Sequence, residues 1–171
     1  MNFLAIDFET ADYQPDSACA VGLVRVENEK IVAREAYLIK PPRNTMVFTY
    51  LHGITMADVM SKPKFRDVWK TAEPLMKDID FFVAHNAGFD KGVLHACCAS
   101  SGLPLPATEF ECTMRLARKI WKIRPTKLPD VCRRFDISLN HHDAASDSDA
   151  CAQIMIRVLQ ETGNTFLKNK K

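Results

Sequence analysis

Residues 3–10 read FLAIDFET, an apolar run that ends in two carboxylates, Asp7 and Glu9. A run of this kind without a helical break predicts a strand buried on both faces, as in the middle of an α/β sheet. Because side chains alternate along a strand, Asp7 and Glu9 share a face, where each raises the other's pKa unless a cation or solvent takes up the charge. A divalent metal would meet that need. For an arbitrary D-x-E pair, however, one capping acid beside one solvated acid is the commoner arrangement.

The length and charge of the chain limit its class without identifying it. Its 171 residues fit one domain with an ordinary core. The net charge of +2 is too small to indicate a nucleic-acid-binding protein, although basic residues concentrate between Arg115 and Arg134. A basic run on a helix is more often a solvated face than a phosphate-binding one. Charge therefore permits a polyanionic partner and does not require one.

The cysteines favour a reduced environment. Structural zinc sites take closely spaced Cys or His pairs, and no C-x-x-C pair is present, so the thiols are predicted to be small core residues. The sequence shows neither a signal peptide nor a long apolar segment, which favours a cytoplasmic location and no membrane partner. The six positions are Cys19, Cys97, Cys98, Cys112, Cys132 and Cys151.

The pattern along the rest of the chain predicts a mixed sheet covered by helices. Cys19 to Val26 and Ile31 to Ile39 form a predicted hairpin, and two further strands are predicted over Phe81 to Ala84 and Glu109 to Cys112. Residues 50–55 are expected to be irregular. Helices are predicted over Met56 to Met60, from near Pro63 through an apolar stripe ending at Met76, from near Asp90 through Cys97, over Met114 to Trp121, over Lys127 to Phe135, and from Ala144 to near Gly163. Pro74 is expected to kink the second of these or end it early.

Three further side chains join the two acids as candidates for one site. Asp90 follows a buried strand in the first turn of a helix, where its charge suits the helix dipole. Asp147 lies on the apolar face of the last helix, so it points inward and needs a partner. His142 stands just before that helix and can reach the same pocket. Taken singly, each has an ordinary structural role, but the carboxyl ends of sheet strands would bring Asp7, Glu9 and Asp90 together.

The motifs D-F-E-T at residues 7–10, H-N-A-G-F-D at residues 85–90 and H-x4-D at residues 142–147 together resemble the DEDDh branch of the DnaQ-like 3′–5′ exonucleases. The resemblance implies an RNase H-like α/β fold whose mixed, central five-stranded sheet is flanked by helices and has an antiparallel second strand. It implies a single exonuclease domain over residues 1–165, and composition predicts a disordered basic tail over 166–171. The family often has Asp at the position of Cys112. The metal-site carboxylates implied are Asp7, Glu9, Asp90 and Asp147, with His142 as general base.

The same resemblance implies chemistry with two Mg²⁺ or Mn²⁺ ions, hard cations that prefer oxygen ligands. The substrate would be DNA or RNA with a free 3′ end, DNA being favoured, and the products would be 5′-mononucleotides. A DNA polymerase is a compatible protein partner. His141 is expected to be a solvated turn residue. The residues implied in substrate binding are Phe8, Thr10, His52, Gly53, Ile54 and Asn86.

Three other functions fit part of the pattern. A haloacid-dehalogenase-like phosphatase also begins with a strand ending in acids, but it requires D-x-D and position 9 is Glu. An RNase H-like endonuclease would share the fold, although the H-G-I-T segment at residues 52–55 favours action at a chain end. A catalytically inactive nucleic-acid-binding module is disfavoured because all five catalytic positions are filled.

Overall fold

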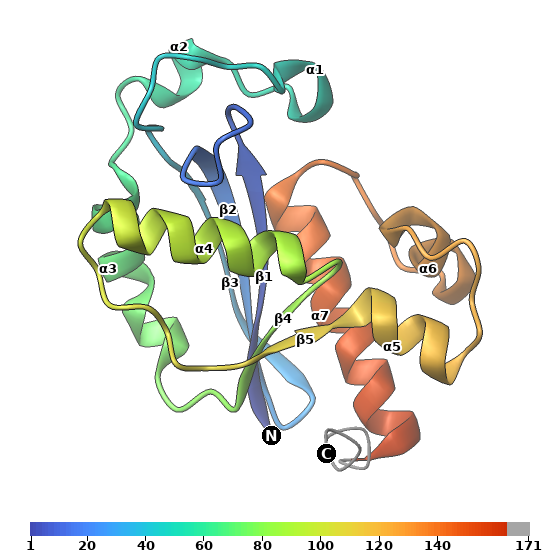
Figure 1. Ribbon diagram of the computed structural model, residues 1–171. Coiled ribbons are helices and arrows are strands. Elements are labelled where there is room, and N and C mark those ends of the chain that lie inside the picture. The colour runs from blue at the N-terminus through green and yellow to red at the C-terminus, as the bar shows by residue number, and fades with distance from the viewer. Residues whose placement is uncertain (164–171) are drawn as a thin grey trace.

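A five-stranded mixed sheet forms the centre of the protein, with the strand order β3-β2-β1-β4-β5 (Figure 1). The computed structural model describes residues 1–163, so the predicted tail over 166–171 and the predicted domain end at 165 lie outside the described residues. The strands are β1 (Asn2–Thr10), β2 (Ala18–Glu27), β3 (Lys30–Leu38), β4 (Phe81–Ala84) and β5 (Phe110–Cys112). β2 pairs antiparallel with both β1 and β3, whereas β4 is parallel to β1 and β5 to β4. The predicted mixed sheet with an antiparallel second strand is confirmed.

The β2–β3 hairpin turns at Asn28 and Glu29, where the sequence predicted it. Both residues have a positive φ, 49° and 64°. A two-residue turn of this handedness matches the right-handed twist of the paired strands. The backbone N–H of Asn28 also donates to the carbonyl of Met1 (3.1 Å), which ties the hairpin to the start of β1.

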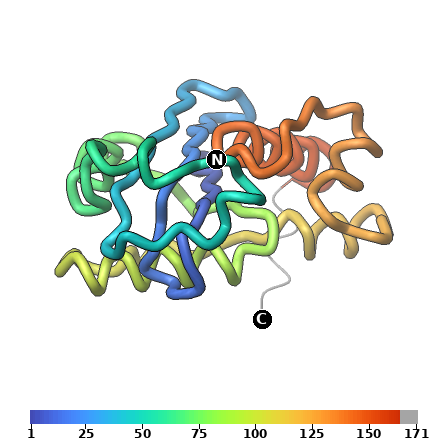
Figure 2. Tube along the Cα trace, turned by 90° about the horizontal axis from the view of Figure 1, so that it is seen from above, coloured from blue at the N-terminus to red at the C-terminus, as the bar shows by residue number. Residues whose placement is uncertain are grey.

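Alternate residues of β1 face opposite layers of helices, as the strand period requires. Phe3 and Ala5 pack into a core that includes buried residues of α7, whereas Leu4 and Ile6 pack into a second core formed with α3 and α4. Figure 2 shows α4 and α7 on opposite sides of the strands. The two acids of β1 continue the row of Phe3 and Ala5, so the strand period directs them toward α7.

Seven helices lie within residues 1–163. They are α1 (Thr49–His52), α2 (Met56–Val59), α3 (Phe65–Met76), α4 (Gly88–Ser100), α5 (Thr113–Ile120), α6 (Leu128–Phe135) and α7 (Ala144–Thr162). A capping box of Thr55 and Asp58 opens α2. No helix in this part of the chain is long and apolar enough to span a membrane. The six cysteines are buried and free, as the core interpretation predicted.

One local prediction was wrong, and one of the two alternatives for Pro74 is excluded. Residues 49–52 form α1 instead of irregular chain; this single turn buries no residue, so it has no apolar stripe to reveal it. It ends at Gly53, whose φ of 75° is left-handed. Pro74 does not end α3 early, because it falls in the last turn and the helix continues to Met76.

Candidate active site

Three carboxylates converge at the carboxyl end of β1. Asp7 and Glu9 extend from the strand, and Asp147 lies in the first turn of α7. One carboxylate oxygen from each residue lies within 4.8 Å of the others. Oxygen ligands at such spacing can bind a common hard cation.

Asp90 joins this cluster from the first turn of α4. Its Oδ1 accepts a hydrogen bond from the backbone N–H of Phe8 (3.1 Å), which fixes the beginning of α4 against the end of β1. The residue is 1 % exposed. Burial raises the pKa of Asp90 to about 7, the charge of Asp147 adds to this, and the hydrogen bond from Phe8 opposes it.

The four acids strongly disfavour one another's ionised form. Burial raises the pKa of Asp7 well above its ordinary range, and the charges of Asp90, Asp147 and Glu9 reinforce this. Burial also raises the pKa of Glu9 to about 8, with Asp147 and Asp90 as the next causes. Because a bound divalent cation favours the ionised form, it would reverse the direction of these pKa changes.

Asp147 offers an oxygen suited to such a cation. Its Oδ1 is buried and has no hydrogen-bond partner among residues 1–163. A buried carboxylate oxygen without a partner is costly, so a ligand there would stabilise the site. The start of α7 is itself fixed, because Asp143 caps it by accepting from the backbone N–H of Ser146. The donor set therefore fits a divalent metal.

Gly22 allows α7 to approach the sheet. It lies opposite Asp7 in the β1–β2 register, and a Cβ at this position would meet the carbonyl oxygen of Ala144 at 1.9 Å and its carbon at 2.4 Å. Because both are backbone atoms at the start of α7, a side chain could be accommodated only by moving the helix. The absence of a side chain at Gly22 thus helps to place Asp147 beside Asp7.

Two histidines adjoin Asp147 in different ways. The Nδ1 of His141 donates to Asp147 Oδ2 (2.9 Å), and the backbone N–H of His142 donates to the same oxygen (3.1 Å). Their rings stack with centroids 3.9 Å apart. Burial lowers the pKa of His142, as does the charge of His141, whereas Asp147 raises it. His141 is therefore more than the solvated turn residue that the sequence predicted, since its ring hydrogen-bonds to Asp147.

A pocket of about 290 Å³ is lined on one side by Asp7, Glu9, Asp147 and both histidines, and its other wall is apolar. That wall comes from Phe48 just before α1, from Leu51 in α1 and from Phe89 in α4. Leu51 and Phe89 are 44 % and 48 % exposed. A second hollow of about 400 Å³ shares Phe48 and Phe89 and extends to Tyr13. Tyr13 is 78 % exposed and meets the Phe48 ring edge-on at 4.9 Å. An exposed aromatic edge beside an acidic pocket suits a ligand with both planar and anionic parts.

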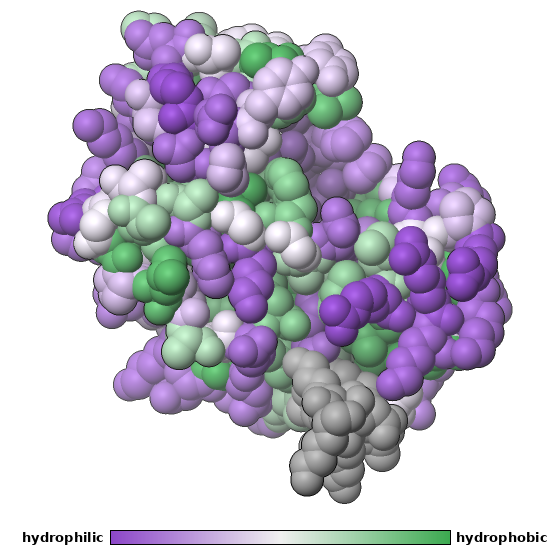
Figure 3. Space-filling model, in the orientation of Figure 1, coloured by the Kyte–Doolittle hydropathy of each residue, from purple (hydrophilic) through white to green (hydrophobic). Residues whose placement is uncertain are grey.

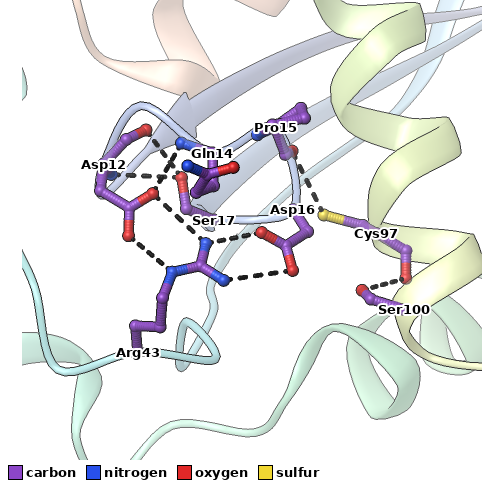
Figure 4. Close-up of polar contacts among 8 residues, drawn as sticks. All are labelled: Asp12, Gln14, Pro15, Asp16, Ser17, Arg43, Cys97 and Ser100. Atoms are coloured by element: carbon purple, nitrogen blue, oxygen red, sulfur yellow. Dashed lines mark hydrogen bonds and ion pairs between the residues drawn. The ribbon is translucent and has the colours of Figure 1, made fainter.

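Arg43 holds the loop that carries Tyr13. Its guanidinium hydrogen-bonds to both Asp12 and Asp16, as Figure 4 shows, with Nε 2.9 Å from Asp12 Oδ2. The side-chain bond to Arg43 is the main cause that lowers the pKa of Asp12. Ser17 Oγ donates to the carbonyl of Asp12 (2.9 Å) and closes the loop. These hydrogen bonds thus fix the Tyr13 loop at the mouth of the second hollow.

A sequence profile of the exonuclease family of RNase T type matches residues 4–155. This span includes all five of the residues described above as catalytic candidates. The chain belongs to the exonuclease family. Exodeoxyribonuclease 10 from Escherichia coli strain K12 is 31 % identical to this exonuclease over 167 residues, which cover 94 % of this chain and 70 % of that protein. The solved structure of exonuclease X in complex with 5′ overhanging duplex DNA has a TM-score of 0.76 at 28 % identity and covers 94 % of this chain and 93 % of that one.

Other relatives are much longer than this exonuclease. A putative bifunctional exonuclease/endonuclease protein of Mycobacterium tuberculosis is 29 % identical over 95 % of this chain but only 27 % of its own length. A PolC-type DNA polymerase III of Caldanaerobacter subterraneus is 28 % identical over 98 % of this chain and 12 % of its own length. The nuclease domain of 3′hExo, a DEDDh family member bound to rAMP, has a TM-score of 0.80 at 21 % identity, covering 94 % of this chain and 92 % of that one, which shows the shared fold.

Only some of the residues predicted to bind substrate line the acidic pocket of the exonuclease. Phe8 and Thr10 line the pocket that contains Asp7, Glu9 and Asp147. Ile54 lines an adjacent hollow together with His52 and His142, and it also packs against a small core near Val59. Among residues 1–163, the lining of this acidic pocket does not include Gly53 or Asn86. Both are exposed and have a left-handed φ. Their substrate contacts stay predictions.

His52 makes two hydrogen bonds to the backbone that the sequence did not predict. Its Nε2 donates to the carbonyl of Thr10 (3.2 Å), and its Nδ1 accepts from the backbone N–H of Ile54 (3.0 Å). The two bonds together require the neutral tautomer that is protonated on Nε2. Burial lowers the pKa of His52, which favours that neutral form. The ring therefore attaches α1 to the end of β1.

Sequence reasoning missed Gly22, Phe48, Leu51, Phe89 and Tyr13 as contributors to the site. Phe89 could have been found from the sequence, because it directly precedes Asp90 within the H-N-A-G-F-D motif. The others come from segments without a motif and meet only in the folded chain. A larger hollow of about 790 Å³ lies between α3 and residues 103–106, but it contains none of the acids and has no part in this site.

Proposed function

We propose that this exonuclease removes 5′-mononucleotides from a free 3′ end by metal-dependent hydrolysis, with DNA preferred over RNA. The proposal rests on one observation: three carboxylates and His142 line a pocket whose opposite wall is apolar and aromatic, and a fourth carboxylate, Asp90, is buried beside them. Such a pocket suits a terminal nucleotide, with its phosphodiester at the acids and its base at the Phe48 and Leu51 wall.

The acids Asp7, Glu9, Asp90 and Asp147 would hold two divalent cations, Mg²⁺ or Mn²⁺, since both ions prefer carboxylate oxygen. Bound there, these cations would neutralise charge that develops on the phosphodiester and lower the pKa of the attacking water. The partnerless Oδ1 of Asp147 supports this occupancy on grounds of structure alone.

His142 would act as general base and take a proton from the attacking water. A base must be neutral at the working pH, and the lowered pKa of His142 supports this role. His141 would position Asp147 through its Nδ1 hydrogen bond. The main chain at Phe8 to Thr10 would hold the 3′ end, because this segment lines the pocket beside Glu9.

A preference for DNA rests on Exodeoxyribonuclease 10, the relative that this chain matches over most of both lengths. The PolC-type relatives support a DNA polymerase as protein partner. Co-sedimentation of the purified chain with a replicative polymerase of the same organism would test the partnership, and the absence of a stable or DNA-dependent complex would contradict it.

The decisive experiment compares linear and circular single-stranded DNA, together with matched 5′-labelled DNA and RNA oligonucleotides, in Mg²⁺ or Mn²⁺. We expect linear DNA to shorten stepwise from the 3′ end with release of 5′-mononucleotides, while circular DNA survives. Cleavage of circles at the same rate would support the endonuclease alternative instead. Binding without hydrolysis in either metal would support an inactive nucleic-acid-binding module.

A further inference from the structure

The segment between Arg115 and Arg134 is strongly basic in a chain that is nearly neutral. It carries eight basic residues against one acid, Asp130, which gives a net charge of +7. Because the whole chain carries +2, the remaining residues carry −5. The basic residues are Arg115, Arg118, Lys119, Lys122, Arg124, Lys127, Arg133 and Arg134. We call α5, α6 and the loop joining them the basic lobe.

The charges of the basic lobe point outward and are mostly unpaired. All eight basic residues are exposed. Within residues 1–163, the only ion pair that any of them forms is the one between Arg133 and Asp130. Figure 3 shows strongly hydrophilic side chains gathered over the side of the molecule where Figure 1 places α5 and α6. A solvated helix face commonly alternates charges of both signs, whereas all but one of the charges here are positive.

The basic lobe is attached to the catalytic end of the sheet. His85, directly after β4, hydrogen-bonds through Nδ1 to Thr113 Oγ1 (2.9 Å) and through Nε2 to the carbonyl of Thr126 (2.9 Å). Arg118 Nε donates to Thr126 Oγ1, which fixes the loop between the two helices. Burial lowers the pKa of His85, and the charges of His141 and Arg118 contribute as well, so its ring lies near both the lobe and the catalytic histidine pair.

We infer that the basic lobe is a phosphate-binding surface for the part of the nucleic-acid strand that lies outside the catalytic pocket. This inference rests on the proposed function. Three carboxylates line the pocket and Asp90 is buried beside them. These acids repel a polyanion until cations are bound, so attraction must come from elsewhere on the surface. Unpaired Lys and Arg side chains supply it by displacing the counterions that surround the phosphates.

The occupant is nucleic acid and not an acidic protein. Stable protein interfaces bury exposed aromatic or aliphatic anchors at their centre. Within the described chain, the large hydrophobic residues that are exposed all lie outside residues 115–134. A surface of charges without such anchors suits a flexible sugar–phosphate backbone, to which it binds without reading the base sequence.

The test uses a triple variant of the basic lobe, Lys119→Gln, Lys122→Gln and Arg124→Gln. Its matched control is Lys62→Gln, Lys64→Gln and Lys70→Gln, which removes the same charge from exposed positions before and on α3. Both are made in an Asp7→Asn background so that a 20-nucleotide 5′-fluorescent oligo-dT stays intact in Mg²⁺. Fluorescence anisotropy at several salt concentrations gives the affinity and its salt dependence.

We expect the lobe triple to weaken binding about tenfold or more at low salt and to reduce the slope of log affinity against log salt by about 0.7 for each phosphate that the variant no longer neutralises. The control triple should keep the parental slope. Equal losses of affinity in both triples, or an unchanged affinity in the lobe triple, would overturn the inference.

A second readout separates this inference from the proposed function. With active-site Asp7 restored, hydrolysis of the p-nitrophenyl ester of thymidine 5′-monophosphate needs no strand outside the pocket, so the lobe triple should retain the parental kcat/KM. A large loss on this ester would assign the lobe residues to the pocket and overturn the inference. An unmutated enzyme that hydrolyses neither ester nor oligonucleotide would refute the proposed function, while the binding slopes would still decide the role of the lobe.

Discussion

The Glu9→Gln substitution should stabilise the metal-free protein increasingly as the pH rises. Burial and the neighbouring acids raise the pKa of Glu9 from 4.5 to about 8. A carboxyl group with a raised pKa keeps its proton in the folded state at a pH where the unfolded chain has already released it. Folding is therefore favoured at low pH, and this contribution is lost as the pH rises from about 4.5 to about 8. Glutamine mimics the protonated carboxyl at every pH and avoids this loss.

The size of the effect follows from the proton linkage. One proton held by the folded state alone changes the free energy of unfolding by about 1.4 kcal/mol per pH unit, which gives an upper limit of about 4 kcal/mol between pH 5 and pH 8. Glu9 is partly exposed, so solvent screens its charge, and Asp7 and Asp90 can hold the proton in its place. We therefore expect about 2 kcal/mol, or roughly 4–8 °C in Tm for a domain of this size.

The assay is thermal melting in EDTA from pH 5 to pH 8.5, with the difference in Tm between variant and parent plotted against pH. Glu73→Gln, at an exposed position of α3, is the matched control and should show a flat difference. Saturating Mg²⁺ should remove most of the advantage of Glu9→Gln, because a bound cation offsets the repulsion in the parent. A difference that stays flat with pH, or one that falls as the pH rises, would refute the electrostatic reasoning.

Three further predictions concern hydrolysis and packing. Asp7→Asn should abolish digestion of linear DNA and leave the fold intact, as circular dichroism would show; undiminished turnover would contradict the metal site. Gly22→Ala should lower stability by about 1–3 kcal/mol and reduce kcat, because its Cβ would meet the Ala144 backbone; an unchanged urea midpoint would show that α7 moves freely. His142→Ala should reduce the rate by about 10²–10⁴, and parental activity should fall below a pKa that lies under 6.5, where the base becomes protonated. His141→Ala should cost less; a pH–rate profile showing a larger loss for it would reassign the base.

The sequence by itself determined the frame of the fold and the acids of the site. The alternation along residues 3–10 predicted a buried strand with Asp7 and Glu9 on one face, and the packing of Phe3 and Ala5 beside α7 agrees. The apolar face of the last helix placed Asp147 inward, and it is 4 % exposed. These predictions succeeded because strand and helix periods are local properties, so the direction of a side chain follows from its position in the repeat.

Only the tertiary structure decided how the pieces of the site support one another. The attachment of α1 by His52 and the close approach of α7 at Gly22 both join segments that lie far apart in sequence. The contact of His141 with Asp147 is more local, but the chain between them passes through the left-handed residue His142. A motif specifies which residue types are present and roughly where each element ends. It does not specify which ring turns toward which acid, because that depends on long-range packing between elements whose spacing no local pattern records.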